Sequence, residues 1–179
     1  TVDLEPTDLE VLQLVATAPD RLEDRLLPAL GVDLPTLRRL DAVGLLERER
    51  GGLRFRHELA RHALESTVPP GGAPHLHARL LKALETVEPQ EASVLTHHAV
   101  AAHDNLAAVR YAQEAAREAV IAGSHAEAAA FLETAVEYLE GAVPSVRARL
   151  LLQLSFELYM TSRLAEAIDT ARSTFVLWR

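Results

Sequence analysis

Residues 44–56 read GLLERERGGLRFR, and this stretch decides the fold of the first part of the chain. Short runs of apolar and charged residues, LLERER and LRFR, lie on the two sides of Gly51-Gly52. A glycine pair between two such runs is typical of a tight turn, because glycine adopts the backbone angles that the turn requires. The sequence therefore predicts a β-hairpin, with residues 45–50 as its first strand and residues 53–56 as its second.

Helical patterns precede this hairpin. Apolar residues recur at helical spacing in three segments, residues 7–17, 21–30 and 34–43. Asp33 and Pro35 are residue types that favour the first turn of a helix, which supports the start of the third segment. Three short helices followed by a hairpin is the order of a winged-helix domain, and we predict such a domain for residues 1–70.

A linker rich in proline and glycine, residues 69–74, separates this domain from a helical remainder rich in alanine. Residues 123–128 and 162–167 share the pattern of a turn followed by Glu-Ala, and residues 103–108 are a weaker copy. Small residues where antiparallel helices touch are typical of stacked helix pairs. We therefore predict a TPR-like α-solenoid for residues 71–179, truncated at its C-terminus, and a mainly α fold with one small β-hairpin overall.

Composition excludes several classes of site. The chain has no cysteine, so it forms no disulfide and no cysteine-based zinc centre, which fits a cytoplasmic location. No segment has the ~20 consecutive apolar residues of a membrane-spanning helix. The histidine pairs His75/His77 and His97/His98 diverge around a helix, so we expect no metal site. No phosphate-binding loop or nucleophile motif occurs, and we expect no catalytic residues.

The arginines of the predicted third helix and hairpin allow two interpretations. As a DNA-reading surface they would make a recognition helix and a basic wing, comprising Arg38, Arg39, Arg48, Arg50 and Arg54. As an ordinary solvated surface they would be neutralised by the interleaved glutamates. Residues 1–70 carry 13 acidic and nine basic side chains, and the whole chain has a net charge of −8, so the second interpretation is favoured.

The segment GLRFRHELARHAL, residues 52–64, resembles the end of the winged-helix domain in STAND-type signalling NTPases. It is most similar to the large ATP-binding LuxR-type transcription regulators of actinobacteria. In relatives, a Met-His-Asp motif at this place contacts a nucleotide phosphate. The resemblance implies that Arg56, His57 and Glu58 sense nucleotide in a longer parent protein. The alternative is that His57 merely N-caps or stabilises the start of the following helix, residues 58–67.

The resemblance implies a regulatory segment that relays the nucleotide state of an upstream NTPase domain. Its helical repeats would bind a protein or small-molecule effector, and a downstream helix-turn-helix domain would contact DNA. ATP or ADP would bind in the parent protein, and no cofactor is expected in this segment. Alternatives are a free-standing winged-helix DNA-binding regulator with a helical dimerisation or effector domain, or the same arrangement behind a cyclase or kinase domain. Truncation would leave the apolar last helix, with Phe175 and Trp178, uncovered, so a homodimer could form through it as an artefact of that truncation.

Overall fold

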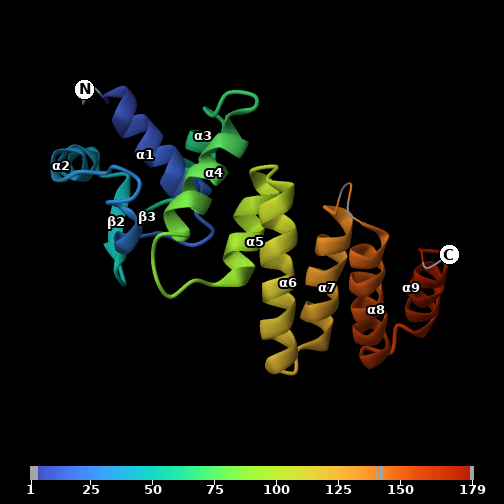
Figure 1. Ribbon diagram of the computed structural model, residues 1–179. Coiled ribbons are helices and arrows are strands. Elements are labelled where there is room, and N and C mark those ends of the chain that lie inside the picture. The colour runs from blue at the N-terminus through green and yellow to red at the C-terminus, as the bar shows by residue number, and fades with distance from the viewer. Residues whose placement is uncertain (1–3, 140, 142, 178–179) are drawn as a thin grey trace. The chain divides into compact units, whose positions relative to one another are not determined.

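The computed structural model describes residues 4–139, 141 and 143–177 (Figure 1). The chain divides into two compact units, residues 1–90 and residues 91–179. The described part is mainly helical, with one small antiparallel sheet in the first unit. Trp178 lies outside the described residues, as does the side chain of Phe175, so the homodimer expected through them stays a prediction.

From residue 4 on, the first unit contains four α-helices, a short 3₁₀ helix and three strands. In chain order these are α1 (Pro6–Thr17), β1 (Leu22–Glu23), the 3₁₀ helix Asp24–Leu26, α2 (Leu34–Val43), β2 (Leu46–Glu49), β3 (Gly52–Phe55), α3 (Glu58–Glu65) and α4 (Gly72–Leu84). The strand order is β1-β3-β2, and both pairings are antiparallel. The predicted hairpin of β2 and β3 is confirmed (Figure 1). The short strand β1 pairs with β3 and extends the sheet.

The hairpin turns one residue earlier than Gly51-Gly52. Glu49 pairs with Gly52, so Arg50 and Gly51 form the turn, and both have positive φ angles, 49° and 80°. Two successive positive φ angles give a turn whose twist matches that of paired strands. Gly52 belongs to β3, where an added Cβ would lie 2.9 Å from the carbonyl oxygen of Leu22. The second glycine therefore allows β1 to approach β3.

The helix predicted for residues 21–30 is wrong. Leu22 pairs with Leu53 in the sheet, and a 3₁₀ turn follows at Asp24–Leu26. Pro28 disfavours a continuous helix here, because it has no backbone N–H and its ring crowds the preceding turn. Although the segment is not a helix, its apolar residues are buried in the core, namely Leu22, Leu26, Leu27 and Leu30.

Helix α4 belongs to the first unit, one helix beyond the boundary predicted after residue 70. Leu76 and Leu80 are buried in the same apolar cluster as Leu12 and Leu40. The proline- and glycine-rich segment before α4 is thus a connection within one core. A glycine-rich stretch permits a turn between packed helices as readily as it permits a domain boundary.

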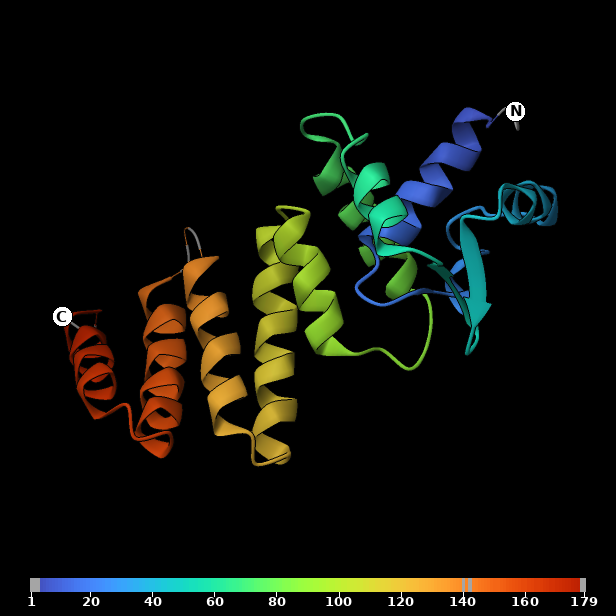
Figure 2. The ribbon, with the colours of Figure 1, turned by 180° about the vertical axis from the view of Figure 1, so that it is seen from behind.

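The second unit is a run of helices, each packed mainly on the next. They are α5 (Ala92–Ala101), α6 (Asn105–Ile121), α7 (His125–Glu137), α8 (Pro144–Met160) and α9 (Leu164–Leu177). Figure 2 shows them following one another in chain order. Alanines fill much of the contact: Ala112, Ala129 and Ala135 are fully buried. Such small side chains let neighbouring helices approach closely.

Three turns of this unit have the same geometry. His103, Gly123 and Ser162 each have a positive φ angle, of 59°, 75° and 63°. The next backbone N–H in each turn donates to a carbonyl five residues earlier, from Asp104 to Ala99, Ser124 to Ala119 and Arg163 to Leu158. This is the hydrogen bond that closes a helix ending in a left-handed residue. The three segments singled out by their similar sequences therefore share one structure.

His125 and Glu157 join α7 to α8 at the end near the Gly123 and Ser162 turns. The Nδ1 atom of His125 lies 2.7 Å from Oε2 of Glu157, whose side chain is 7% exposed.

Among the described helices, none combines the length and apolar character needed to cross a membrane.

Candidate functional site

The candidate DNA-reading helix is α2, and its Arg39 is bonded to a buried carboxylate. Arg39 Nε and Nη2 donate to the two carboxylate oxygens of Asp8, at 2.9 and 2.7 Å. Asp8 is fully buried, and it also accepts a hydrogen bond from the backbone N–H of Glu5. The bonds from Arg39 hold the pKa of Asp8 below its usual range. Arg39 thus tethers α2 to α1.

The hairpin arginines are also neutralised. Arg48 Nη1 lies 3.1 Å from Asp24 Oδ1, and Arg54 Nη2 lies 2.8 Å from Glu47 and 2.7 Å from Glu49. Arg50, at the turn, lies 3.7 Å from Glu49. Because each positive charge faces a carboxylate, the hairpin presents little net charge to a phosphate backbone.

Arg38 is the remaining candidate of this group, and it is exposed on α2. It lines a small groove of about 260 Å³ between α2 and the hairpin, together with Leu34, Leu37 and Asp41. Within the described residues, Arg38 forms no ion pair shorter than 4.0 Å. One unpaired arginine is a small electrostatic footprint for DNA binding, which normally uses several phosphate contacts.

The three candidate nucleotide-sensing residues lie in the connection from β3 to α3. Arg56 Nε donates to the carbonyl of Leu46 at 3.1 Å, and Glu58 forms an ion pair with Arg61. His57 is the N-cap residue of α3, is exposed, and makes no side-chain capping hydrogen bond. His57 therefore occupies the N-cap position, as the alternative interpretation has it, but its side chain does not bond to the helix start.

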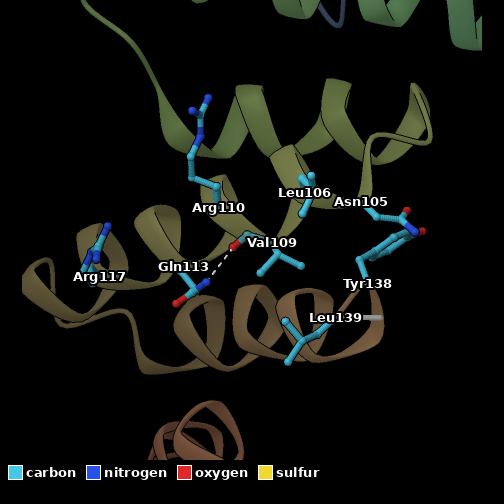
Figure 3. Close-up of a pocket in the computed structure, with 8 residues that line it drawn as sticks. All are labelled: Asn105, Leu106, Val109, Arg110, Gln113, Arg117, Tyr138 and Leu139. Atoms are coloured by element: carbon cyan, nitrogen blue, oxygen red, sulfur yellow. Dashed lines mark hydrogen bonds between the residues drawn. The ribbon is translucent and has the colours of Figure 1, made fainter. Parts of the chain in front are cut away.

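A groove in the second unit was missed by the sequence reasoning (Figure 3). It has a volume of about 530 Å³, and its walls come from α6 and the residues that follow α7. The lining residues are Asn105, Leu106, Val109, Arg110, Gln113, Arg117, Tyr138 and Leu139. Figure 3 shows Arg117 and Gln113 toward one end of the groove and Asn105 and Tyr138 at the other.

The chemistry of this groove is mixed apolar and cationic. Among the described residues, its lining contains two arginines and no carboxylate. Arg117 is exposed and forms no ion pair with any described residue, whereas the Arg110 guanidinium lies 4.2 Å from the ring centroid of Tyr111. Gln113 Nε2 donates to the carbonyl of Val109 at 3.2 Å. The groove can therefore receive a ligand that combines negative charge with apolar groups.

A signal for this groove was present in the sequence. Arg110, Gln113 and Arg117 follow one another at spacings of three and four, which places them on one face of a helix. The many alanines of the same helix indicate only its buried side.

No family model, curated protein or solved structure matches this chain.

Proposed function

We propose that this chain is the regulatory segment of an ATP-dependent transcription regulator of the LuxR type. In this proposal the second unit, a TPR-like stack, binds a protein or small-molecule partner. The first unit, a winged-helix domain, relays the nucleotide state of an NTPase domain and does not contact DNA itself. The support is the resemblance of residues 52–64 to that family, together with how the arginines of each unit are used.

The use of the arginines is the observation that carries the proposal. In the first unit, Arg39, Arg48 and Arg54 each face a carboxylate. Arg38, unpaired among the described residues, lines a groove that also contains the carboxylates of Asp41 and Glu47. In the second unit, Arg117 lines a groove whose described residues include no carboxylate. Cations that are paired within the protein hold the fold, whereas a cation left in a groove is available to a ligand. This contrast favours partner binding by the helices over DNA binding by the first unit.

The nucleotide-relay part of the proposal rests on His57. Its imidazole is exposed at the start of α3, so it can donate to a phosphate oxygen of a nucleotide held by another domain. Arg56 and Glu58 are bound to Leu46 and Arg61, so they position the segment on either side of His57.

A transcript comparison tests this proposal without knowledge of the target genes. Four strains are compared: wild type, a deletion of the gene, and chromosomal Arg117→Glu and Arg172→Glu variants of the full-length protein. Arg172 is an exposed arginine of α9 outside the groove, so it controls for the change of charge. We expect the Arg117→Glu strain to share transcript changes with the deletion strain and the Arg172→Glu strain to match wild type. A deletion that alters no transcripts would refute a role in transcription.

DNA binding by this chain separates the proposal from a free-standing DNA-binding regulator. We expect no salt-sensitive binding of duplex DNA. Binding that weakens in an Arg38→Ala, Arg50→Ala double variant would support the alternative instead. These two arginines are suitable because, unlike Arg39, neither is bonded to a buried carboxylate.

A further inference from the structure

The repeated turns relate α6 to α8 residue by residue. Gly123 and Ser162 occupy the same position of the same turn, so a residue of α6 corresponds to the residue of α8 that lies 39 positions later. By this relation Gln113 corresponds to Leu152, and Arg117 corresponds to Phe156. Equivalent positions of stacked repeats lie on the same side of the stack. The groove-lining face of α6 therefore has a corresponding face on α8, which continues it on the same side of the run of helices.

On α8 this continued face is apolar and uncovered. Leu152 is 61% exposed, Phe156 is 56% exposed and Tyr159 is 61% exposed. Their spacing of four and three residues places them in one stripe along the helix. Leu150, Leu154 and Leu158 hold the opposite side of α8 in the core. A contiguous apolar stripe of this size on a helix surface is typical of a binding surface.

The charge of the combined face is opposite to that of the chain. Arg149 corresponds to Arg110 of α6, and it is exposed without an ion pair to any described residue. The one carboxylate in the sequence of α8, Glu157, is buried against His125. Glu114 of α6 lies beside Arg117 on the helix surface but outside the groove lining. In a chain with a net charge of −8, this face presents cations and apolar groups.

We propose that the α6–α8 face, defined as Arg117, Arg149, Leu152 and Phe156, binds an acidic peptide segment with large apolar side chains. Carboxylates of the peptide pair with the arginines, and its leucine or phenylalanine side chains cover Leu152 and Phe156. The proposal rests on the proposed partner-binding function and specifies the class of partner. A nucleic acid would match the arginines but would leave the apolar stripe uncovered, so a peptide fits both halves of the face.

Fluorescence anisotropy with the full chain tests this inference. The probe is a labelled peptide in which glutamates alternate with leucine and phenylalanine. Two matched peptides replace either the glutamates with glutamine or the apolar residues with serine. We expect the first peptide to bind and each matched peptide to bind about tenfold more weakly, as expected when one set of contacts at the centre of an interface is lost. Equal binding of all three peptides would refute the proposal.

Variants locate the binding surface. Arg117→Glu and Phe156→Ser should each weaken peptide binding about tenfold. Arg172→Glu and Leu59→Ser are the matched controls, because both residues are exposed and lie outside the face, and they should leave binding unchanged. Controls that weaken binding as much as the face variants would contradict the assignment.

Glu114→Gln distinguishes loss of a contact from loss of the fold. Removing this carboxylate beside Arg117 should strengthen binding about twofold, which a damaged fold would not do. If Arg117→Glu weakens binding and Phe156→Ser does not, the partner is a simple anion and the α8 half of the inference is wrong. If no peptide binds while the Arg117→Glu strain still shares the deletion's transcript changes, the inference fails and the proposed function stands.

Discussion

At the three turns with positive φ angles, replacing glycine by alanine and replacing another residue by glycine should change the free energy of unfolding in opposite directions. A left-handed backbone costs a residue with a Cβ roughly 1–2 kcal/mol, whereas glycine adopts it freely. A Cβ added at Gly123 would meet no atom within 4 Å, so the backbone is the main cost of Gly123→Ala. Alanine also restricts the unfolded chain, which returns about 0.5 kcal/mol. We therefore expect Gly123→Ala to lower the free energy of unfolding by about 1 kcal/mol.

The reverse changes should stabilise. Ser162 and His103 have the same left-handed backbone as Gly123, so Ser162→Gly and His103→Gly relieve strain and each should raise the free energy of unfolding by about 0.5 kcal/mol. Urea titration followed by helical circular dichroism measures the change. Hydrogen exchange of the α6, α7, α8 and α9 amides assigns it to the second unit.

The reasoning would be refuted if Gly123→Ala and Ser162→Gly changed the free energy of unfolding in the same direction. If glycine at Ser162 destabilises as much as alanine at Gly123, the three turns are not equivalent, and the relation between α6 and α8 would lose its basis. A control at an exposed interior position of a helix, Ala130→Gly in α7, should destabilise by about 1 kcal/mol and shows that glycine alone does not stabilise.

Three further predictions concern the cores. Because the folded-state pKa of Asp8 is lowered, its bonds to Arg39 stabilise the protein at neutral pH, and this contribution should be lost as the pH falls below about 4; Asp8→Asn should reduce stability at pH 7 and flatten the acid limb of a stability–pH curve. His125→Ala leaves the buried Glu157 without its partner and should cost about 1–3 kcal/mol by urea titration, with hydrogen exchange affected in the second unit. Leu80→Ala should cost about 2–5 kcal/mol and accelerate hydrogen exchange in α1, because α4 shares the core of the first unit; exchange faster only in the second unit would contradict that division.

Local patterns predicted the elements that local interactions determine. The hairpin, the helix start at Asp33 and the repeated turns all follow from residues close in sequence. Asp33 accepts a hydrogen bond from the backbone N–H of Thr36 at 2.9 Å, as a helix-capping residue does. The prediction was wrong at residues 21–30, because Leu22 gains a strand partner, Leu53, that is distant in the sequence.

The ion-pair partners of the arginines and the walls of the groove could not be predicted from local sequence patterns. A sequence shows Arg39 and Asp8 as two separate charges, and only the packing of α2 on α1 makes them a buried pair. The charge balance of residues 1–70 did indicate neutralised arginines, but it could not assign each partner. The groove beside Arg117 needed the position of Tyr138 and Leu139 across from α6, which again depends on how the helices pack.

The packing of α5 to α9 mainly on consecutive helices has a mechanical consequence. Most contacts in this unit join residues that are near in the chain, so folding closes only short loops and is expected to be fast. Folding can begin at any adjacent pair of helices and spread to its neighbours. For the same reason, a force applied along the stack would be resisted at one interface at a time. The unit should extend elastically and release its helices one after another.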